Sequence, residues 1–371
     1  MLFAVLNQLS CNDPRPAPRS GRRGRPRKHT IAEVVFAALC AVLCGYKTVD
    51  HFVLFAQERL AFLREYLPYE HGAPSRATFY RLIALIGPAA FTAMLARLAA
   101  PLDPGGHLAF DGKAVRGATG LMLLHAYASE TGLTLAAHEI PDKTNEIPVL
   151  REMLKQIDVR GRTITADALH TQRETAAAIA AAGGRYVLPL KLNQTSPHDD
   201  VELFLADPAT HVQTCQDVDA EHGRIETRIA RVSTDIAWLS HHAWPGLAAI
   251  GRVDRTRVDK RTGGTVSETQ LYLLGHAFGA DELNATARSH WAIENGLHWV
   301  LDVTFDEDAA RSDKTAASNL ATLRRIALNA SRSTPTPKKQ TTPSHGPQRP
   351  QPRQPPCRAA KIRCNEFMRS P

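Results

Sequence analysis

The 371-residue sequence lacks several features that would place it among secreted or membrane proteins. Its six cysteines are scattered and form no Cys-x-x-Cys pair, which argues against a disulfide scaffold and predicts a reduced protein. The longest apolar run, Val34–Cys44, is too short to cross a membrane. Residues 1–10 have neither a basic segment nor a small-residue cleavage pattern, so no signal peptide is expected. These absences favour a cytoplasmic protein.

The body of the chain also lacks net charge, although the formal charge of the whole sequence is +8. Residues 331–371 hold nine Lys or Arg and one acid, which accounts for the entire excess. Within the body, residues 14–29 carry seven positive charges and no acid. Any affinity for nucleic acid must therefore come from local basic patches.

Residues 1–29 are predicted to form a basic, flexible arm. The run Arg23-Gly24-Arg25-Pro26 matches the core of a minor-groove AT-hook, in which Arg23 and Arg25 would lie in the narrow groove of A·T-rich DNA. The alternative is a solvated linker, because short Arg/Gly/Pro runs are common.

Residues 30–102 are predicted to form a helical domain that binds DNA. Thr30 and Ser75 are suitable N-caps for two of its helices. The helix after Ser75 follows a turn and presents Arg76, as the recognition helix of a helix-turn-helix would. A plain helical bundle with a solvated basic face is the alternative.

Residues 103–330 change to short apolar strands alternating with helices, which indicates an α/β fold. Strands are expected at Leu108–Val115, Leu121–Ser129, Leu133–Ile140, Arg162–Asp167 and Arg185–Leu192, and helices at Asn145–Ile157 and Gln172–Ala182. Three antiparallel strands followed by parallel strands reached through crossover helices predict an RNase H-like mixed sheet flanked by helices. A β-rich insertion is expected at about 208–279, followed by a long helix over about 280–300 and another over about 316–330. The Pro-rich tail, 331–371, is predicted to be disordered.

Three carboxylates are expected to meet in such a fold. Asp111 would end the first strand, Asp167 would end the fourth strand beside it, and Glu294 lies on the helix after the sheet. Two Mg²⁺ ions need several hard oxygen ligands of this kind, with open positions left for water and phosphate. The residues alone therefore indicate a metal-dependent enzyme that acts on nucleic acid.

Several motifs, taken in order, resemble insertion-sequence transposases of the H-repeat-associated (ISAs-type) group, within the DDE transposase superfamily. The resemblance covers about residues 12–330. The motifs are Asp111-Gly112-Lys113 with Arg116-Gly117, Lys143-Thr144-Asn145-Glu146-Ile147, Thr165-Ala166-Asp167-Ala168-Leu169-His170-Thr171-Gln172, Lys191 with Asn193-Gln194, His222-Gly223-Arg224-Ile225-Glu226-Thr227-Arg228, and His290-Trp291 through Glu294 to Val303.

The resemblance implies that Asp111, Asp167 and Glu294 are catalytic metal ligands that hold two Mg²⁺ or Mn²⁺ ions. It implies DNA cleavage and strand transfer at the ends of an insertion sequence. The implied partners are double-stranded DNA, as terminal inverted repeats and target, and further copies of the chain in a homo-oligomer assembled on DNA. The implied location is the bacterial cytoplasm, at the nucleoid.

Basic and polar residues near these motifs are candidate DNA contacts. Lys113 and Arg116 follow the first acid, where the alternative is a solvated turn. Three further candidates end the last core strand, namely Lys191, Asn193 and Gln194. The last helices are expected to present a basic face suited to the DNA backbone, made of Arg311, Lys314, Arg324 and Arg325.

The sequence departs from the family pattern in a short loop, Gly117 to Leu121, and in its tail, and it does not meet a signature of related insertion sequences. His290 and Leu301 stand where related insertion sequences have the Arg and Lys of a Tyr-x2-Arg-x3-Glu-x6-Lys signature, so those two roles are not carried over. The tail from about Ser331 does not resemble the family, and a frameshift there is our hypothesis. Two alternatives to a transposase remain: an inactive copy that only binds DNA, and a structure-selective RNase H-like nuclease.

Overall fold

The chain divides into two compact units. The computed structural model describes residues 28–118, 120–141, 146–221, 223–309 and 314–333. The first unit comprises Met1–Leu102, Val115–Leu121 and Trp299–Pro371, and the second comprises Asp103–Ala114 and Met122–His298. The sequence placed residues 299–330 with the catalytic domain. They group instead with the N-terminal helices, because the last helix, α12 (Lys314–Ser333), packs on those helices.

The first unit is built of helices. They are α2 (Ile31–Leu43), α3 (Val49–Glu58), α4 (Leu60–Arg64), α5 (Arg76–Leu85), α6 (Pro88–Ala99), η1 (Ala100–Leu102), α11 (Trp299–Val303), η6 (Glu307–Ala309) and α12. Both predicted N-caps are confirmed, since Thr30 Oγ1 accepts a hydrogen bond from the N–H of Glu33 at 3.1 Å and Ser75 Oγ accepts one from Thr78 at 3.3 Å. These bonds satisfy N–H groups that have no partner within the helix.

Two arginines of α12 are buried, which contradicts the predicted basic face. Arg325 is fully buried, and its Nη1 atom lies 2.7 Å from Oε1 of the equally buried Glu307. Arg324 is 3% exposed and donates to the carbonyl of Lys47 at 3.4 Å. The cations of the last helices were expected to face solvent, but Arg324 and Arg325 both lie beside the buried carboxylate of Glu307.

Long apolar helices are scarce in the described part of the chain. Within it, no single helix has both the length and the apolar character needed to cross a membrane. The segments Arg76–Leu85 and Pro88–Leu102 meet that test only as a pair, and they are bent by 85°.

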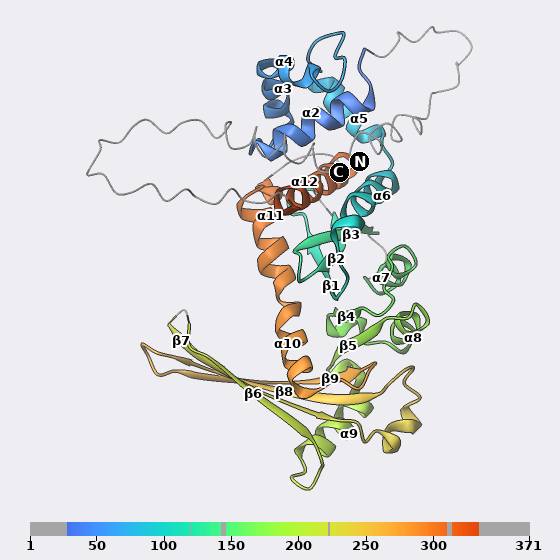
Figure 1. The fold of residues 1–371 in the computed structure, drawn as a ribbon, viewed down its shortest axis with the longest axis vertical. Helices are drawn as coiled ribbons and strands as arrows, with labels where there is room; N and C mark the ends of the chain where they lie inside the picture. Colours follow the sequence, from blue (N-terminus) through green and yellow to red (C-terminus); the bar gives the residue numbers. More distant parts are fainter. Residues whose placement is uncertain (1–27, 119, 142–145, 222, 310–313, 334–371) are drawn as a thin grey trace. The chain divides into compact units, whose positions relative to one another are not determined.

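The second unit is organised by one mixed sheet (Figure 1). Its strands are β1 (His107–Ala114), β2 (Met122–Ala128), β3 (Leu133–Ile140), β4 (Thr163–Ala166), β5 (Arg185–Leu190), β6 (Gln213–Asp219), β7 (Arg224–Ser233), β8 (Ala249–Asp259) and β9 (Thr265–Leu274). Strands β1, β2 and β3 pair antiparallel, while β4 runs parallel to both β1 and β5. The predicted RNase H-like order of the first five strands is confirmed.

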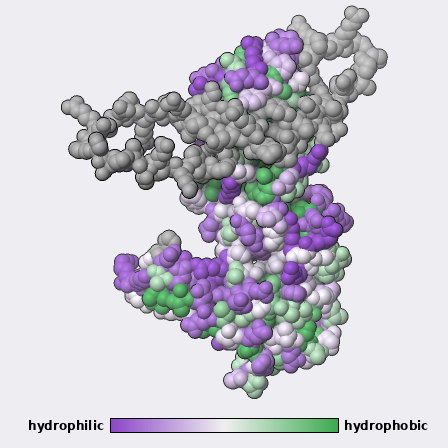
Figure 2. Space-filling view, in the orientation of Figure 1, coloured by the Kyte–Doolittle hydropathy of each residue, from purple (hydrophilic) through white to green (hydrophobic). Residues whose placement is uncertain are grey.

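The β-rich insertion continues this sheet. The strand order is β3-β2-β1-β4-β5-β9-β8-β7-β6, so β9 pairs antiparallel with β5, as at Leu188 and Leu273. The outer ends of the long strands expose Val218, Ile225 and Val266. Figure 2 shows a hydrophobic patch at this end, surrounded by hydrophilic surface. Strand content was predicted correctly here, but the continuous sheet was not.

Helices cover both faces of the sheet (Figure 1). The second unit contains α7 (Glu146–Leu154), η2 (Ala168–His170), α8 (Arg173–Ala181), η3 (Leu192–Gln194), α9 (Thr195–Ala206), η4 (Ala237–His242) and α10 (Ala280–His290). Helix α10 crosses one face, while α7 and α8 pack on the first five strands. Under α10, Leu283 lies so close to Gly251 that a Cβ atom on this glycine would be 2.4 Å from Leu283 Cδ2. The core is therefore tightly packed between α10 and β8.

The long helix predicted over 280–300 is interrupted. Helix α10 ends at His290, and a π-helical segment follows at Glu294–His298. Within that segment, a Cβ atom on Gly296 would lie 2.2 Å from the hydroxyl of Tyr127 on β2. The glycine thus allows the π segment to approach β2. Single π turns inside helices are frequent at functional sites.

Candidate active site

The first of the three predicted acids lies inside β1. Asp111 is not at the strand end, as expected, because pairing with β2 continues to Ala114. Pairing with β4 stops at Phe110, however, so Asp111 lies one residue beyond the last pair with β4. The Asp111 carboxylate accepts the Gly112 N–H at 2.8 Å and lies 3.4 Å from His298 Nδ1.

The second acid follows the neighbouring strand. Phe110 of β1 is paired with Ala166 of β4, so Asp111 and Asp167 are the next residues on two parallel, adjacent strands. His290 Nε2 lies 3.9 Å from Asp167 Oδ1. This imidazole is the largest cause of a lowered pKa at Asp167. The parallel register thus brings the two predicted acids together.

The charge of the third acid, Glu294, affects the pKa of the first, Asp111. Glu294 is the first residue of the π segment and is exposed. Burial raises the pKa of Asp111 to about 7, with the charge of Asp167 as the next cause. Glu294 adds to that rise, so all three carboxylates contribute to one region of negative potential. A cation placed among them would remove this mutual repulsion, and hard oxygen donors suit a divalent ion such as Mg²⁺.

A chain of hydrogen bonds orients His290, which sequence reasoning did not assign. Ser289 Oγ donates to the Thr286 carbonyl at 3.0 Å, so it accepts from His107 Nδ1 at 2.9 Å. His107 Nε2 then accepts from the Thr165 hydroxyl at 2.7 Å. The Thr165 oxygen accepts in turn from His290 Nδ1 at 2.8 Å. Burial, with His290 as a second cause, lowers the pKa of His107 to about 3, which keeps this ring neutral.

This order of donors fixes the His290 ring. Its Nδ1 donates to Thr165, and this bond turns the ring so that Nε2 faces Asp167. Partners of this kind orient metal ligands and keep them in one tautomer. The His290-Trp291 motif was the signal that could have identified the ring, but its contact with Thr165 joins strands and helices far apart in sequence.

A fourth carboxylate, Glu146, lies against the backbone beside Asp111. A Cβ atom on Gly112 would be 2.3 Å from Glu146 Oε1, and Glu146 Oε2 lies 3.3 Å from Nε2 of the buried His170. Gly112 is therefore the residue that leaves room for Glu146. Sequence reasoning gave Glu146 no role, although it stands in one of the motifs.

Three of the predicted DNA contacts lie close to Asp167. Lys191 is exposed, and its charge is among the causes that lower the pKa of Asp167. Asn193 Nδ2 donates to the Ala168 carbonyl at 2.8 Å, and Gln194 Nε2 donates to the Thr171 carbonyl at 3.1 Å. Both amides thus hold the loop after Asp167 in place.

The other predicted DNA contacts differ in their surroundings. Lys113 is 7% exposed, with its Nζ atom 3.4 Å from the Ala114 carbonyl. Arg116 has an exposed side chain 3.6 Å from Asp308, and Arg76 forms an exposed ion pair with Asp50 at 2.6 Å. Three of the predicted residues lie outside the described ranges: Arg23, Arg25 and Arg311.

A pocket beside Asp167 receives cations from the insertion. Strands β7 and β8 are apolar where α10 covers them, as at Ala230 and Val253. Two residues further along the same face, Arg228 and Arg255 line the pocket with Lys191, Asp167 and His290. Glu226 holds the Arg228 side chain at 2.6 Å. Sequence reasoning gave these arginines no role, because the alternation of apolar and charged residues indicated only that the segments are strands.

Comparison with protein families assigns the class. A family model described as Transposase DDE domain matches residues 104–330, and one described as DDE_Tnp_1-associated matches residues 19–99. The chain therefore belongs to the transposase DDE domain family.

Its relatives agree with the predicted group. An uncharacterized protein in the dhlA 3′ region of Xanthobacter autotrophicus is 39% identical over 269 residues, covering 69% of this chain and 90% of that protein. Putative transposase YncI of Escherichia coli O157:H7 is 28% identical, covering 81% and 82%. H repeat-associated putative transposase YhhI of Escherichia coli K12 is 25% identical, covering 81% and 85%.

One solved structure is also similar. It is a piggyBac transposase synaptic complex with hairpin DNA, matched at 12% identity with a TM-score of 0.40 over 90% of this chain and 72% of that chain. The family assignment rests on the sequence matches.

Proposed function

We propose that the chain cleaves DNA at the ends of an insertion sequence and joins those ends to target DNA. Asp111, Asp167 and Glu294 would be its catalytic carboxylates. The observation that supports this proposal most directly is the parallel pairing of Phe110 with Ala166, because Asp111 and Asp167 are the residues that follow this pair. The effect of Glu294 on the pKa of Asp111 adds the third.

The same carboxylates would hold two Mg²⁺ or Mn²⁺ ions. Their oxygens are the hard ligands that these ions prefer. The pKa of Asp111 is raised first by burial and then by the negative charge of Asp167, and a cation would neutralise that charge. When bound, such ions activate an attacking oxygen and stabilise the leaving 3′ oxygen. His290 and His298 would keep Asp167 and Asp111 in position.

Phosphates would be held beside this site by cations from β5 and the insertion. Lys191, Arg228 and Arg255 line the pocket that contains Asp167. Arginine donates several hydrogen bonds in a fixed plane that matches phosphate oxygens. Asn193 and Gln194, which brace the loop after Asp167, would act by positioning that loop.

The first unit would contact the element's terminal repeats. Helix α5 begins at Arg76, whose exposed guanidinium lies 5.3 Å from the ring of Tyr80. We also propose DNA contacts by five further residues, namely Arg23, Arg25, Lys113, Arg116 and Arg311. Arg324 is buried and is not proposed as a DNA contact. We further propose that several copies assemble on DNA at the bacterial nucleoid.

The test is cleavage of DNA that carries the element's ends. Mg²⁺ or Mn²⁺ should support cleavage by the full chain, and Asp111→Asn should abolish it while leaving DNA binding intact. Cleavage at the wild-type rate by Asp111→Asn would overturn the proposal.

The second candidate is a copy that binds DNA without cleaving it. The tail from about Ser331, which does not resemble the family in sequence, favours this reading. The same assay decides, because such a copy would bind the ends and cleave them no faster than Asp111→Asn.

A further inference from the structure

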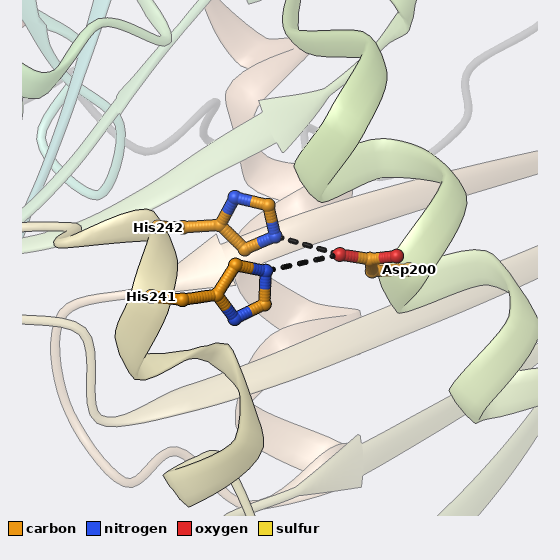
Figure 3. A group of neighbouring side chains, drawn as sticks. All are labelled: Asp200, His241 and His242. Atoms are coloured by element: carbon orange, nitrogen blue, oxygen red, sulfur yellow. Dashed lines mark hydrogen bonds and ion pairs between the residues drawn. The ribbon is translucent and has the colours of Figure 1, made fainter.

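A second group of ligand-type side chains joins α9 to η4. Asp200 of α9 faces His241 and His242 of η4 (Figure 3). The Nε2 atoms of the two rings lie 3.5 Å and 2.7 Å, respectively, from Asp200 Oδ2. The three ligand atoms all lie within 4.8 Å of one another. None of these residues belongs to the candidate active site.

One ring nitrogen of His241 is already used by the backbone. Its Nδ1 atom lies 2.9 Å from the carbonyl of Trp238. A carbonyl only accepts, so Nδ1 donates to it, and Nε2 is left to face the Asp200 carboxylate. Either a proton or a metal ion between Nε2 and the carboxylate oxygen satisfies both atoms. A backbone carbonyl bonded to one ring nitrogen is also how many metal-binding histidines are oriented.

Packing holds the two elements together. The Trp238 ring of η4 lies on Phe204 of α9, with the ring centroids 4.5 Å apart. Trp238 Nε1 also donates to the Asp235 carbonyl at 2.9 Å. The imidazoles of His241 and His242 lie 3.9 Å apart by their centroids, so both present Nε2 to the same side. The ligands are thus arranged by the fold itself.

We propose that Asp200, His241 and His242 bind one transition-metal ion of the zinc class. Two imidazole nitrogens and one carboxylate oxygen are suitable zinc ligands, and a water molecule would complete a tetrahedron. Mg²⁺ prefers oxygen ligands throughout, so this site differs in metal preference from the three acids. The bound ion would clamp η4 onto α9. The nearby group His198, Asp199 and Glu202 offers only one imidazole.

The experiment begins with removal of bound metal from the full chain. Zinc is then titrated into the protein in excess Mg²⁺, and calorimetry measures the binding. Wild-type protein should bind zinc, and His241→Ala should lower the affinity by about tenfold or more. His241 is 60% exposed, so its removal does not open the core. His211→Ala, another exposed histidine of this unit, is the matched control and should bind as wild type does.

Two further readouts assign the ion to this site. Cobalt(II) in place of zinc should give the visible absorption of a tetrahedral site in wild-type and Asp111→Asn protein, and should not do so in His241→Ala. Zinc should also raise the melting temperature of wild-type protein more than that of His241→Ala. Absence of zinc binding would overturn the proposal, as would affinity unchanged in both His241→Ala and Asp200→Asn. Loss of the ion in Asp111→Asn alone would also overturn it, since the acids would then be the zinc site.

Discussion

The two halves of the nine-stranded sheet present the same face to α10 and use it differently. In the first half, His107, Thr165 and Asp111 face the helix or its continuation and form a polar, hydrogen-bonded layer. In the insertion, the face under α10 is apolar and turns cationic only beyond it, as at Arg255. The comparison shows that coverage by α10 decides where charge can appear. Both halves deliver charged groups to the region of His290, where α10 ends.

The strongest challenge to the polar half is Thr165→Val, which preserves shape but removes the hydroxyl between His107 and His290. We expect roughly a 10–100-fold loss of cleavage, with a higher Mn²⁺ requirement, because the His290 ring loses its orienting partner. Cleavage rates measured against Mn²⁺ concentration provide the readout. Thr163→Val, earlier on the same strand, should have little effect. Equal rates and equal metal dependence in both variants would show that the orientation of His290 does not affect cleavage.

The apolar half can be challenged at Gly251. In Gly251→Ala the new Cβ would lie 2.4 Å from Leu283 Cδ2, so either the Leu283 side chain leaves its place or α10 shifts from β8. We expect unfolding to become easier by about 1–3 kcal/mol, as for other overpacked cores. Chemical denaturation measures this change, with Gly264→Ala in the exposed β8–β9 turn as the control. Equal stability of the two variants would show that α10 does not pack as described.

Glu146 is the remaining acid of the first half, and Gly112 is the means of testing it. Gly112→Ala would push the Glu146 carboxylate away, since the two atoms would be 2.3 Å apart. We expect about a tenfold loss of cleavage, close to that of Glu146→Ala. The double variant should be no worse than either single variant, because both changes act on one contact. Additive losses would mean that Gly112 serves another purpose.

The smallest effect is expected in the cationic part of the insertion. Arg255→Ala should weaken DNA binding and reduce the slope of log affinity against log salt by roughly 0.9, the value for one lost phosphate contact. Arg261→Ala, an exposed arginine in the β8–β9 turn, is the control. Binding isotherms at several salt concentrations measure both slopes. Identical slopes would show that the charged end of β8 does not contact DNA.

Much of the first half could be predicted from the sequence because its signals are local. Alternating apolar residues and turns are short-range patterns, and they predicted the order of the first five strands. The helix caps at Thr30 and Ser75 in the first unit are local signals of the same kind. Asp167 was placed correctly after β4, since the apolar run ends there. Asp111 was placed at a strand end, although β2 keeps the strand paired beyond it.

The rest depends on contacts between distant parts of the chain. Neither β5 nor β9 has a sequence feature that identifies the other as its partner, so the continuous sheet could not be predicted. Glu146 touches Gly112 only after the sheet and α7 have assembled. Arg325 looked like a surface cation because its partner, Glu307, lies in a separate turn. In each case the contact partner is distant in sequence, so local spacing could not predict the surroundings of the residue.

The central claim is that Asp111, Asp167 and Glu294 form one metal site, and Mn²⁺ binding tests it most directly. Electron paramagnetic resonance can count bound Mn²⁺ on the full chain in the presence of end-containing DNA. We expect Asp111→Asn, Asp167→Asn and Glu294→Gln each to reduce the bound Mn²⁺, whereas the exposed control Asp207→Asn should not. Undiminished Mn²⁺ binding in all three variants would contradict it.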